Sequence, residues 1–280
     1  MLKRVLVAVI FVPIVIALIA LGGLPFALFA AIVAGMASWE LLHAIAKLPL
    51  RMYVYSTIAA AAIPLGFFFG IGIGVRVLGF AALILMVTTF SEAILAYDRE
   101  CAIPVDNVLK CFFSGIFMPA MLSALSILNS YGPEGHARPY LVMTIGLAFI
   151  TDGGAYFAGV LLGRHRGITQ VSPNKSIEGY VGGLFTGVLF AVVLGLILQF
   201  GLGYTVNYLY LVVYGLLGAL VTEVGDLAFS LIKREYGIKD YGKLLPGHGG
   251  MMDRFDSMVF CAPLVMLLST CIPAFFRLIP

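Results

Sequence analysis

The sequence predicts an all-α, polytopic integral membrane protein with about nine transmembrane helices and a cytoplasmic N-terminus. Hydrophobic residues make up 61% of the 280 residues and charged residues only 11%, whereas soluble chains carry about 25% charged residues. Apolar runs of about 18 or more residues recur, each long enough to cross about 30 Å of hydrocarbon as a helix. The Lys and Arg residues also gather in loops on one side of such a layout, which sets the orientation.

Polar or helix-breaking segments separate the apolar spans. A Gly-Gly-Leu-Pro break at 22–25 separates the first two, and the polar segments 98–108 and 132–135 bound the fifth. The first span follows two basic residues as a signal peptide does. It lacks a clear small-residue cleavage site and leads straight into a second span, so we interpret it as a helix. The expected spans are residues 5–22, 24–44, 53–73, 77–97, 110–130, 140–162, 179–200, 207–231 and 256–277.

The distribution of basic residues supports nine helices rather than an even number. With the N-terminus inside, 14 of the 17 Lys and Arg residues fall on the cytoplasmic side and three outside, as the positive-inside rule requires. Two long polar loops, 163–178 and 232–255, then open on the cytoplasmic side, where nucleotides are found. We therefore expect any polar chemistry at the inner surface, in a bacterial inner (plasma) membrane.

Acidic side chains inside the apolar spans are the first candidates for function, because charges are costly in hydrocarbon. Asp152 lies near the middle of the sixth span, and Glu223 and Asp226 lie in the eighth. Residues three and four apart share a helical face. Ser230 and Lys233 continue the face of Asp226, so this helix is expected to present a polar stripe.

A second acidic pair, Asp253 and Asp256, repeats this spacing at the start of the ninth helix. Mg²⁺ takes oxygen ligands and is usually held by one or two carboxylates plus substrate phosphates. We therefore predict Asp226, Asp253 and Asp256 as metal ligands. The alternative is structural: Asp253 caps the helix and Asp256 pairs with Arg254 or Lys233.

The loop between these pairs is basic and broken by glycine. Glycine lets backbone N–H groups approach an anion closely, although the spacing is not that of a P-loop. A phosphate hydrogen bond suits the lone histidine better than a metal, because no second histidine is near. The residues expected to bind substrate here are Ser230, Arg234, Lys239, His248, Gly249, Gly250 and Arg254. For the basic residues, contact with anionic lipid headgroups is the alternative.

The other cytoplasmic loop reads SPNKSIEG and runs into the seventh helix. Helix N-termini favour anions, so this segment suits recognition of a phosphate or a base edge. A capping turn with Glu178 as a first-turn acid is the alternative. The residues expected to contact substrate are Ser172, Asn174 and Lys175.

Other polar residues give weaker indications. Glu40 and Glu92 lie near the cytoplasmic ends of apolar spans, where structural pairing or snorkelling is expected. The four cysteines form no CxxC spacing, so zinc and redox sites are unsupported. A net charge of +3 is too small to indicate nucleic-acid binding. We find no repeats and no linker, and predict one membrane domain, 1–280, with N-terminal helices in 1–138 and the nucleotide and metal site in 139–280.

Residues 230–256 resemble the signature of the phosphatidate cytidylyltransferases (CDP-diacylglycerol synthases). The pattern is S-x-I-K-R-x4-K-D-x-G-x2-L-P-x-H-G-G-M-x-D-R-F-D, and the segments DGGAYFAG from Asp152 and SPNKSIEG from Ser172 are similar to upstream blocks of that family. The resemblance covers the whole chain and is most specific in the C-terminal half.

This resemblance implies an integral membrane enzyme that makes CDP-diacylglycerol and pyrophosphate from CTP and phosphatidate, using Mg²⁺. It implies that Asp226 and Asp253 are metal ligands and that Asp256 is an essential neighbour. It places Ser172, Lys175, Ser230 and Lys233 in the substrate site, with Lys233 among the catalytic residues.

Two alternatives remain open at this point. A CTP-dependent lipid-alcohol kinase has a similar site, and an ion-coupled transporter would use Asp152, Glu223 and Asp226 as a relay. Paired broken helices would favour the transporter, and the sequence shows no such symmetry. A CDP-alcohol phosphotransferase is disfavoured, because its D-x2-D-G-x2-A-R pattern is absent. The sequence leaves open a second, monovalent cation, a homodimer, the acyl-chain preference and the loop that reads cytosine.

Overall fold

The computed structural model describes residues 13–97, 102–130, 137–167, 169–244 and 249–276. Eight helices in these ranges are long and apolar enough to cross a membrane, which confirms the all-α polytopic class. Residues 13–21 are also helical, and the start of the predicted first span lies outside the described residues. The elements are α2 (Gly23–Ile45), α3 (Leu50–Phe68), α4 (Ile71–Tyr97), α5 (Val105–Phe112), the π-helical η1 (Phe113–Phe117), α6 (Met118–Ser130), α7 (Ala137–Leu161), α8 (Ile177–Leu202), β1 (Thr205–Val206), α9 (Tyr208–Glu235), α10 (Met252–Cys271) and β2 (Phe275–Phe276).

Several predicted boundaries are displaced: the fifth span begins at Val105 rather than at 110, and the last helix ends at Cys271 rather than at 277. The break between the third and fourth spans was expected at 73–77, but α3 ends at Phe68 and α4 begins at Ile71. Gly70 makes this turn with φ of 136°, a conformation open to glycine and costly for other residues. The last helix begins at Met252, one turn earlier than the predicted 256, so it includes both Asp253 and Asp256.

The chain forms two compact units. The first contains Met1–Ser130 and Glu235–Phe255, and the second contains Tyr131–Arg234 and Asp256–Pro280. The loop 235–255 therefore belongs with the N-terminal helices, although most of α9 and α10 belongs to the second unit. The prediction of a single domain, with its halves divided at 138, stays a prediction.

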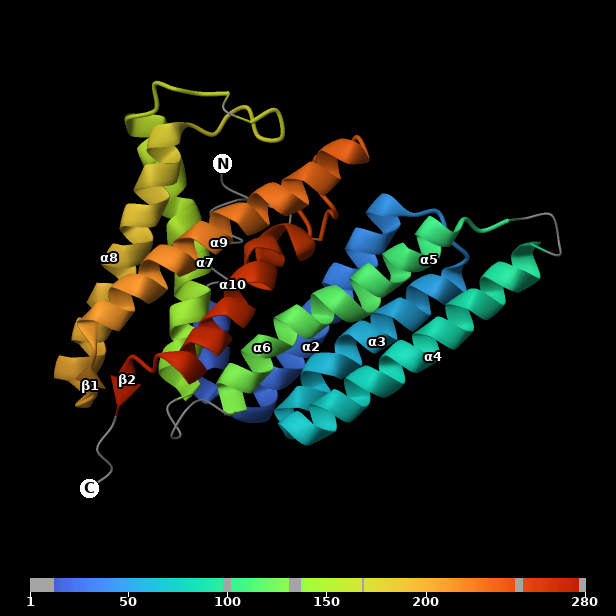
Figure 1. Ribbon diagram of the computed structural model, residues 1–280, viewed down its shortest axis with the longest axis horizontal. Coiled ribbons are helices and arrows are strands. Elements are labelled where there is room, and N and C mark those ends of the chain that lie inside the picture. The colour runs from blue at the N-terminus through green and yellow to red at the C-terminus, as the bar shows by residue number, and fades with distance from the viewer. Residues whose placement is uncertain (1–12, 98–101, 131–136, 168, 245–248, 277–280) are drawn as a thin grey trace. The chain divides into compact units, whose positions relative to one another are not determined.

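In the first unit, α3 packs against α2, α4 and α6 (Figure 1). Small residues permit close approach: a Cβ on Gly115 would lie 3.1 Å from the Ser56 Cα. The Asn129 amide closes the bundle at one end, because its Nδ2 donates to the Gly23 carbonyl (2.8 Å) and its Oδ1 accepts from the Gly23 N–H (3.1 Å). This side chain satisfies a backbone donor at the start of α2 that the helix itself leaves unpaired.

The outward surface of α4 is typical of a lipid-facing helix. Only 11% of its most apolar window is buried inside the protein, and large side chains such as Phe80 and Ile84 are more than half exposed. A continuous apolar surface of this kind marks contact with a membrane rather than with water. The helix satisfies its own backbone hydrogen bonds, as hydrocarbon surroundings require.

In the second unit, α7 and α8 lie side by side (Figure 1). Their contact is built on small residues, since a Cβ on Gly182 would overlap Ala158 and one on Gly154 would overlap Thr186. Small residues at such positions let membrane helices approach closely. Gly187 continues the stripe toward Ala219 of α9. The strands β1 and β2 pair antiparallel after α8 and α10. This tight packing brings polar residues of four segments together.

Candidate active site

The polar stripe predicted on α9 is present. Glu223, Asp226 and Lys233 all lie within the continuous helix Tyr208–Glu235, at spacings of three and seven that place them on one face. Glu223 is only 5% exposed, and the Asp226 side chain is 25% exposed. A buried carboxylate is expensive unless it is paired or binds a cation, so the neighbours of this face decide its role.

Asp226 is paired with Lys175. The Lys175 Nζ lies 2.5 Å from the Asp226 Oδ2, which joins the loop before α8 to the middle of α9. Burial lowers the pKa of Lys175, but the adjacent Asp226 carboxylate outweighs this and raises it above its usual value. The Lys175 ammonium is therefore protonated at neutral pH. The SPNKSIEG segment thus reaches the polar face of α9.

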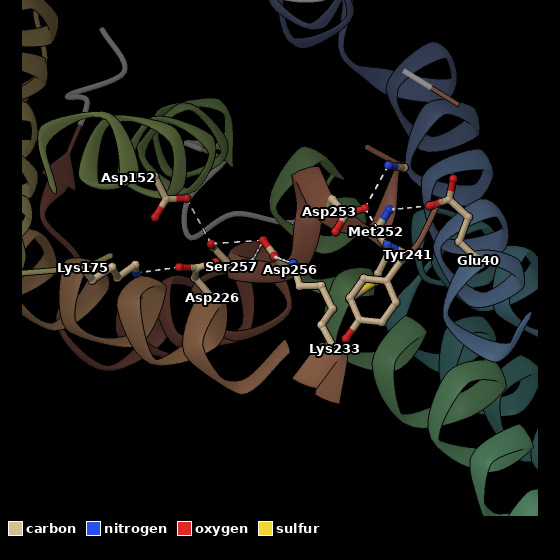
Figure 2. Close-up of polar contacts among 11 residues, drawn as sticks. Glu40, Asp152, Lys175, Asp226, Lys233, Tyr241, Met252, Asp253, Asp256 and Ser257 are labelled. Atoms are coloured by element: carbon tan, nitrogen blue, oxygen red, sulfur yellow. Dashed lines mark hydrogen bonds and ion pairs between the residues drawn. The ribbon is translucent and has the colours of Figure 1, made fainter. Parts of the chain in front are cut away.

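Asp256 and Asp152 extend the cluster onto α10 and α7. The Ser257 N–H donates to the Asp256 Oδ1 (2.8 Å), and the Ser257 hydroxyl donates to the Asp152 Oδ2 (3.2 Å), as Figure 2 shows. The Lys233 Nζ lies 3.9 Å from the Asp256 Oδ2. Four carboxylates and two lysines thus surround one region of the second unit, and we call Asp152, Lys175, Glu223, Asp226, Lys233 and Asp256 the acidic cluster.

The acidic cluster holds more carboxyl groups than lysines. Asp256 lies within electrostatic reach of Asp226, Asp152 and Lys233, and Glu223 within reach of Lys175, Asp152 and Asp226. The Glu223 Oε1 is buried and has no hydrogen-bond partner among the described residues. Carboxyl groups in excess of lysines, with an unpartnered buried oxygen, favour binding of a cation or of a cation with its anionic substrate.

The carboxylates of the acidic cluster fit Mg²⁺ only if substrate phosphates supply further oxygen ligands. No three His, Cys, Asp or Glu side chains converge on a common point in the described part of the chain, so an all-protein metal cage is not indicated there. Mg²⁺ usually keeps several waters and needs only one or two carboxylates together with phosphate oxygens. Asp226 and Asp256 meet that requirement, with hard oxygen atoms on two rigid helices.

Asp253 lies in the first unit and serves the loop 235–255. Its Oδ2 accepts hydrogen bonds from the backbone N–H groups of Tyr241 and Gly250, both at 2.9 Å. These amides belong to the loop before α10, which begins at Met252, so Asp253 fastens the loop and is not the helix N-cap that the alternative interpretation predicted. The contact between Lys233 and Asp256 is one that the alternative named. The metal roles assigned to Asp253, Asp226 and Asp256 stay predictions.

The remaining predicted residues fall into different surroundings. Arg234 donates from its Nε to the Val171 carbonyl (3.2 Å) and so fastens the loop 163–178 to α9. Ser172 closes a turn, since its carbonyl accepts from the Lys175 N–H (3.1 Å). Asn174 and Lys239 are exposed, while Ser230, Arg254 and Gly249 are partly exposed and Gly250 is buried. His248 lies outside the described residues.

The capping turn predicted as the alternative for the SPNKSIEG segment is also present. Ser176 is the N-cap of α8, and its hydroxyl accepts from the Gly179 N–H (3.1 Å). Glu178 lies in the first turn, with its Oε1 2.6 Å from the His165 Nδ1. The capping turn is therefore formed by Ser176 and Glu178, and Lys175 of the same segment enters the acidic cluster. The predicted contact of this segment with substrate stays a prediction.

The Glu223 carboxylate occupies space that Gly183 leaves free, which gives a stability prediction. A Cβ on Gly183 would overlap Glu223 and approach Ala155 and Thr151. We expect Gly183→Ala to lower the free energy of unfolding by about 1–3 kcal/mol, the usual cost of overpacking. The measurement is thermal unfolding in detergent. Gly201→Ala is the matched control on the same helix, because a Cβ there meets nothing within 4 Å; equal losses in both variants would contradict the prediction.

Comparison of the sequence with known proteins identifies the family of this chain. The profile of the Cytidylyltransferase family matches residues 2–272. The chain belongs to this family. Among curated relatives it is 35% identical over 159 residues to the phosphatidate cytidylyltransferase of Staphylococcus haemolyticus, which covers 54% of this chain and 60% of that protein. It is 37% identical over 141 residues to the phosphatidate cytidylyltransferase of Bacillus subtilis, covering 50% and 49%.

The matched stretch spans 60% or less of the length of these curated relatives. A Staphylococcus aureus phosphatidate cytidylyltransferase shows the same limit, with 37% identity over 138 residues and 52% of its length covered. Membership of the cytidylyltransferase family confirms the resemblance inferred from residues 230–256.

The sequence indicated Asp152 and Glu223 as acids within apolar spans, but neither was predicted as a site residue. Both carboxylates belong to the acidic cluster. The signal was available, because each is an acid within an apolar span. Glu40 was interpreted as structural pairing or snorkelling, whereas its Oε2 accepts from the Met252 N–H (2.8 Å). Its partner is 212 positions away, which no local pattern reveals.

Proposed function

We propose that the chain is a phosphatidate cytidylyltransferase, which transfers CMP from CTP to phosphatidate and releases pyrophosphate. The observation that carries this proposal is the acidic cluster of the second unit, in a chain of the cytidylyltransferase family. A charged cluster held between apolar helices suits a reaction between one lipid and one water-soluble polyanion. The relatives bear the name of the same reaction.

The chemistry requires positioning more than proton transfer. A phosphomonoester has a second pKa near 6, so the phosphate of phosphatidate is largely dianionic at neutral pH and needs no general base. Its oxygen attacks the α-phosphorus of CTP, a new P–O bond forms, and the bond to the β-phosphate oxygen breaks with pyrophosphate leaving. Two polyanions must meet, and offsetting their repulsion is the usual catalytic task in such transfers.

The residues of the acidic cluster divide that task. Asp226 and Asp256 would hold Mg²⁺, which when bound supplies positive charge against the triphosphate. Lys175 and Lys233 lie beside these carboxylates and would neutralise phosphate oxygens. Arg234 fixes the loop that carries Lys175. We place the cluster at the cytoplasmic face of a bacterial inner membrane, where CTP enters from water while the acyl chains stay in lipid.

Labelled CTP tests the proposal directly. With purified protein and phosphatidate in detergent micelles, we expect label from the α-phosphate of CTP to enter the lipid, EDTA to abolish the transfer and Mg²⁺ to restore it. Incorporation of γ-label instead would indicate a lipid kinase. Ion flux in proteoliposomes without CTP turnover would indicate a transporter. Either result would overturn the proposed function.

A further inference from the structure

Glu40, near the end of α2, holds the loop 235–255 from outside the loop. Its Oε2 accepts a hydrogen bond from the Met252 N–H at 2.8 Å (Figure 2). Met252 is the first residue of α10, and the N–H groups of a first helical turn have no partner within the helix. A carboxylate at that position is stabilised both by the hydrogen bond and by the positive end of the helix dipole.

Two glycines of the loop pack closely against the same Glu40 carboxylate. A Cβ on Gly250 would overlap the Glu40 Oε2, and a Cβ on Gly242 would overlap the Oε1. Neither glycine has a positive φ, so backbone conformation does not explain their choice. The loop 235–255 therefore contacts Glu40 at three separate positions: Gly242, Gly250 and Met252.

Asp253 supplies the complementary contact from within the loop. Its Oδ2 accepts from Tyr241 and Gly250, the neighbours of the positions that press on Glu40. Two carboxylates, one from α2 and one from α10, thus join residues 241–242 to residues 250–252. Loop residues Lys239 and Asp253, both predicted at the substrate or metal site, depend on this arrangement for their positions.

The contact differs from ordinary pairing of a membrane-edge glutamate. Glu92, in the same unit, lies 3.5 Å from the exposed Arg51 Nη1, and exposed pairs of this kind contribute about 0–1 kcal/mol. Glu40 instead accepts from a backbone amide and fills space left by two glycines. Glu40 therefore orders the backbone of the loop, whereas Glu92 forms an exposed ion pair.

We propose that Glu40 is a positioning residue, which holds the loop 235–255 in one conformation and so sets the positions of the loop residues that were predicted to contact substrate. It does not itself touch the substrate. The catalytic consequence rests on the proposed function, whereas the ordering of the loop does not.

Kinetics form the first test. We expect Glu40→Ala to lower kcat/KM for CTP by about 10- to 100-fold, the scale of a misplaced group near 1 Å, with little change in the KM for phosphatidate. Glu40→Gln keeps an oxygen acceptor for Met252 and is expected to restore most of the activity. Gly250→Ala should be nearly as harmful as Glu40→Ala, and the double variant no worse than Glu40→Ala, because the added methyl then has room. Glu92→Gln is the matched control, with unchanged kinetics.

A spin label at position 240 forms the second test and needs no activity. Asp240 is exposed and adjoins Tyr241, so Asp240→Cys, in a background without the four native cysteines, reports the loop. We expect a more mobile spectrum in Glu40→Ala than in the parent and in Glu40→Gln. Unchanged mobility together with unchanged CTP kinetics would overturn the positioning role. A parent protein unable to make CDP-diacylglycerol would overturn the proposed function alone, since the label still decides on Glu40.

Discussion

Asp226→Asn is expected to reduce the rate of CMP transfer by about 10²–10³-fold or more, the range for loss of one preorganised electrostatic group. The substitution removes the charge that faces Lys175 and weakens the proposed hold on Mg²⁺. Steady-state assays with labelled CTP over a range of Mg²⁺ concentrations measure the effect, and the concentration for half-activation should rise. The fold should persist, because the Lys175 side chain left behind is 25% exposed and reaches water.

Two substitutions of Asp253 distinguish a metal ligand from a residue that only accepts hydrogen bonds from the loop. Asp253→Ala is expected to abolish activity while the protein still inserts and folds. Asp253→Asn keeps an oxygen that can accept from Tyr241 and Gly250 but lacks the charge. An inactive Asp253→Asn variant supports a metal role. An active variant shows that Asp253 serves only to accept the hydrogen bonds of the loop. Full activity of Asp226→Asn at ordinary Mg²⁺ would contradict the assignment of the metal site to the acidic cluster.

Lys233→Met is expected to cost about 3–5 kcal/mol of stability as well as most of the activity. The Lys233 side chain is 11% exposed and that of Asp256 is 7% exposed, so the substitution leaves a buried carboxylate without this partner. Removing one member of a buried pair has a cost of that size. Thermal unfolding in detergent measures the stability, and the labelled-CTP assay measures the activity.

The double variant Lys233→Met/Asp256→Asn distinguishes these two effects. Replacing both members of a buried pair removes the uncompensated charge and is often close to neutral for stability. We therefore expect thermal stability near that of the parent, with activity still lost, because both groups would act on the substrate or its metal. Recovery of activity with stability would show that the pair is purely structural.

Much of the architecture could be predicted, because long apolar runs in a sequence indicate membrane-spanning helices. The apolar runs marked the helices, and intramembrane acids marked Asp152, Glu223 and Asp226, since hydrocarbon leaves few reasons to keep a charge. The start of α10 was misplaced by one turn, because the charged residues Asp253 and Arg254 were interpreted as loop. A helix at the membrane edge can begin in a polar stretch when its first amide groups find partners elsewhere.

The contacts between distant segments could not be predicted. Glu40 and Met252 are joined across 212 positions, and neither carries a local pattern that names the other. Gly250 was predicted as an anion-binding position, whereas a Cβ there would meet Glu40, as would one on Gly242. A glycine in the sequence can indicate a position without room for a side chain. Only the packing in the structure shows which neighbouring group occupies that room.

The attachment of loop 235–255 to the first unit has a consequence for building chimaeras. Exchanging the first 130 residues with those of another family member separates the loop from the helices that it packs against. A hybrid that lacks a carboxylate at position 40 should therefore make a protein with intact membrane helices and a poorly ordered loop. Modular exchange in this family has to move residues 235–255 together with the N-terminal segment, so the crossover points fall within α9 and the first turn of α10.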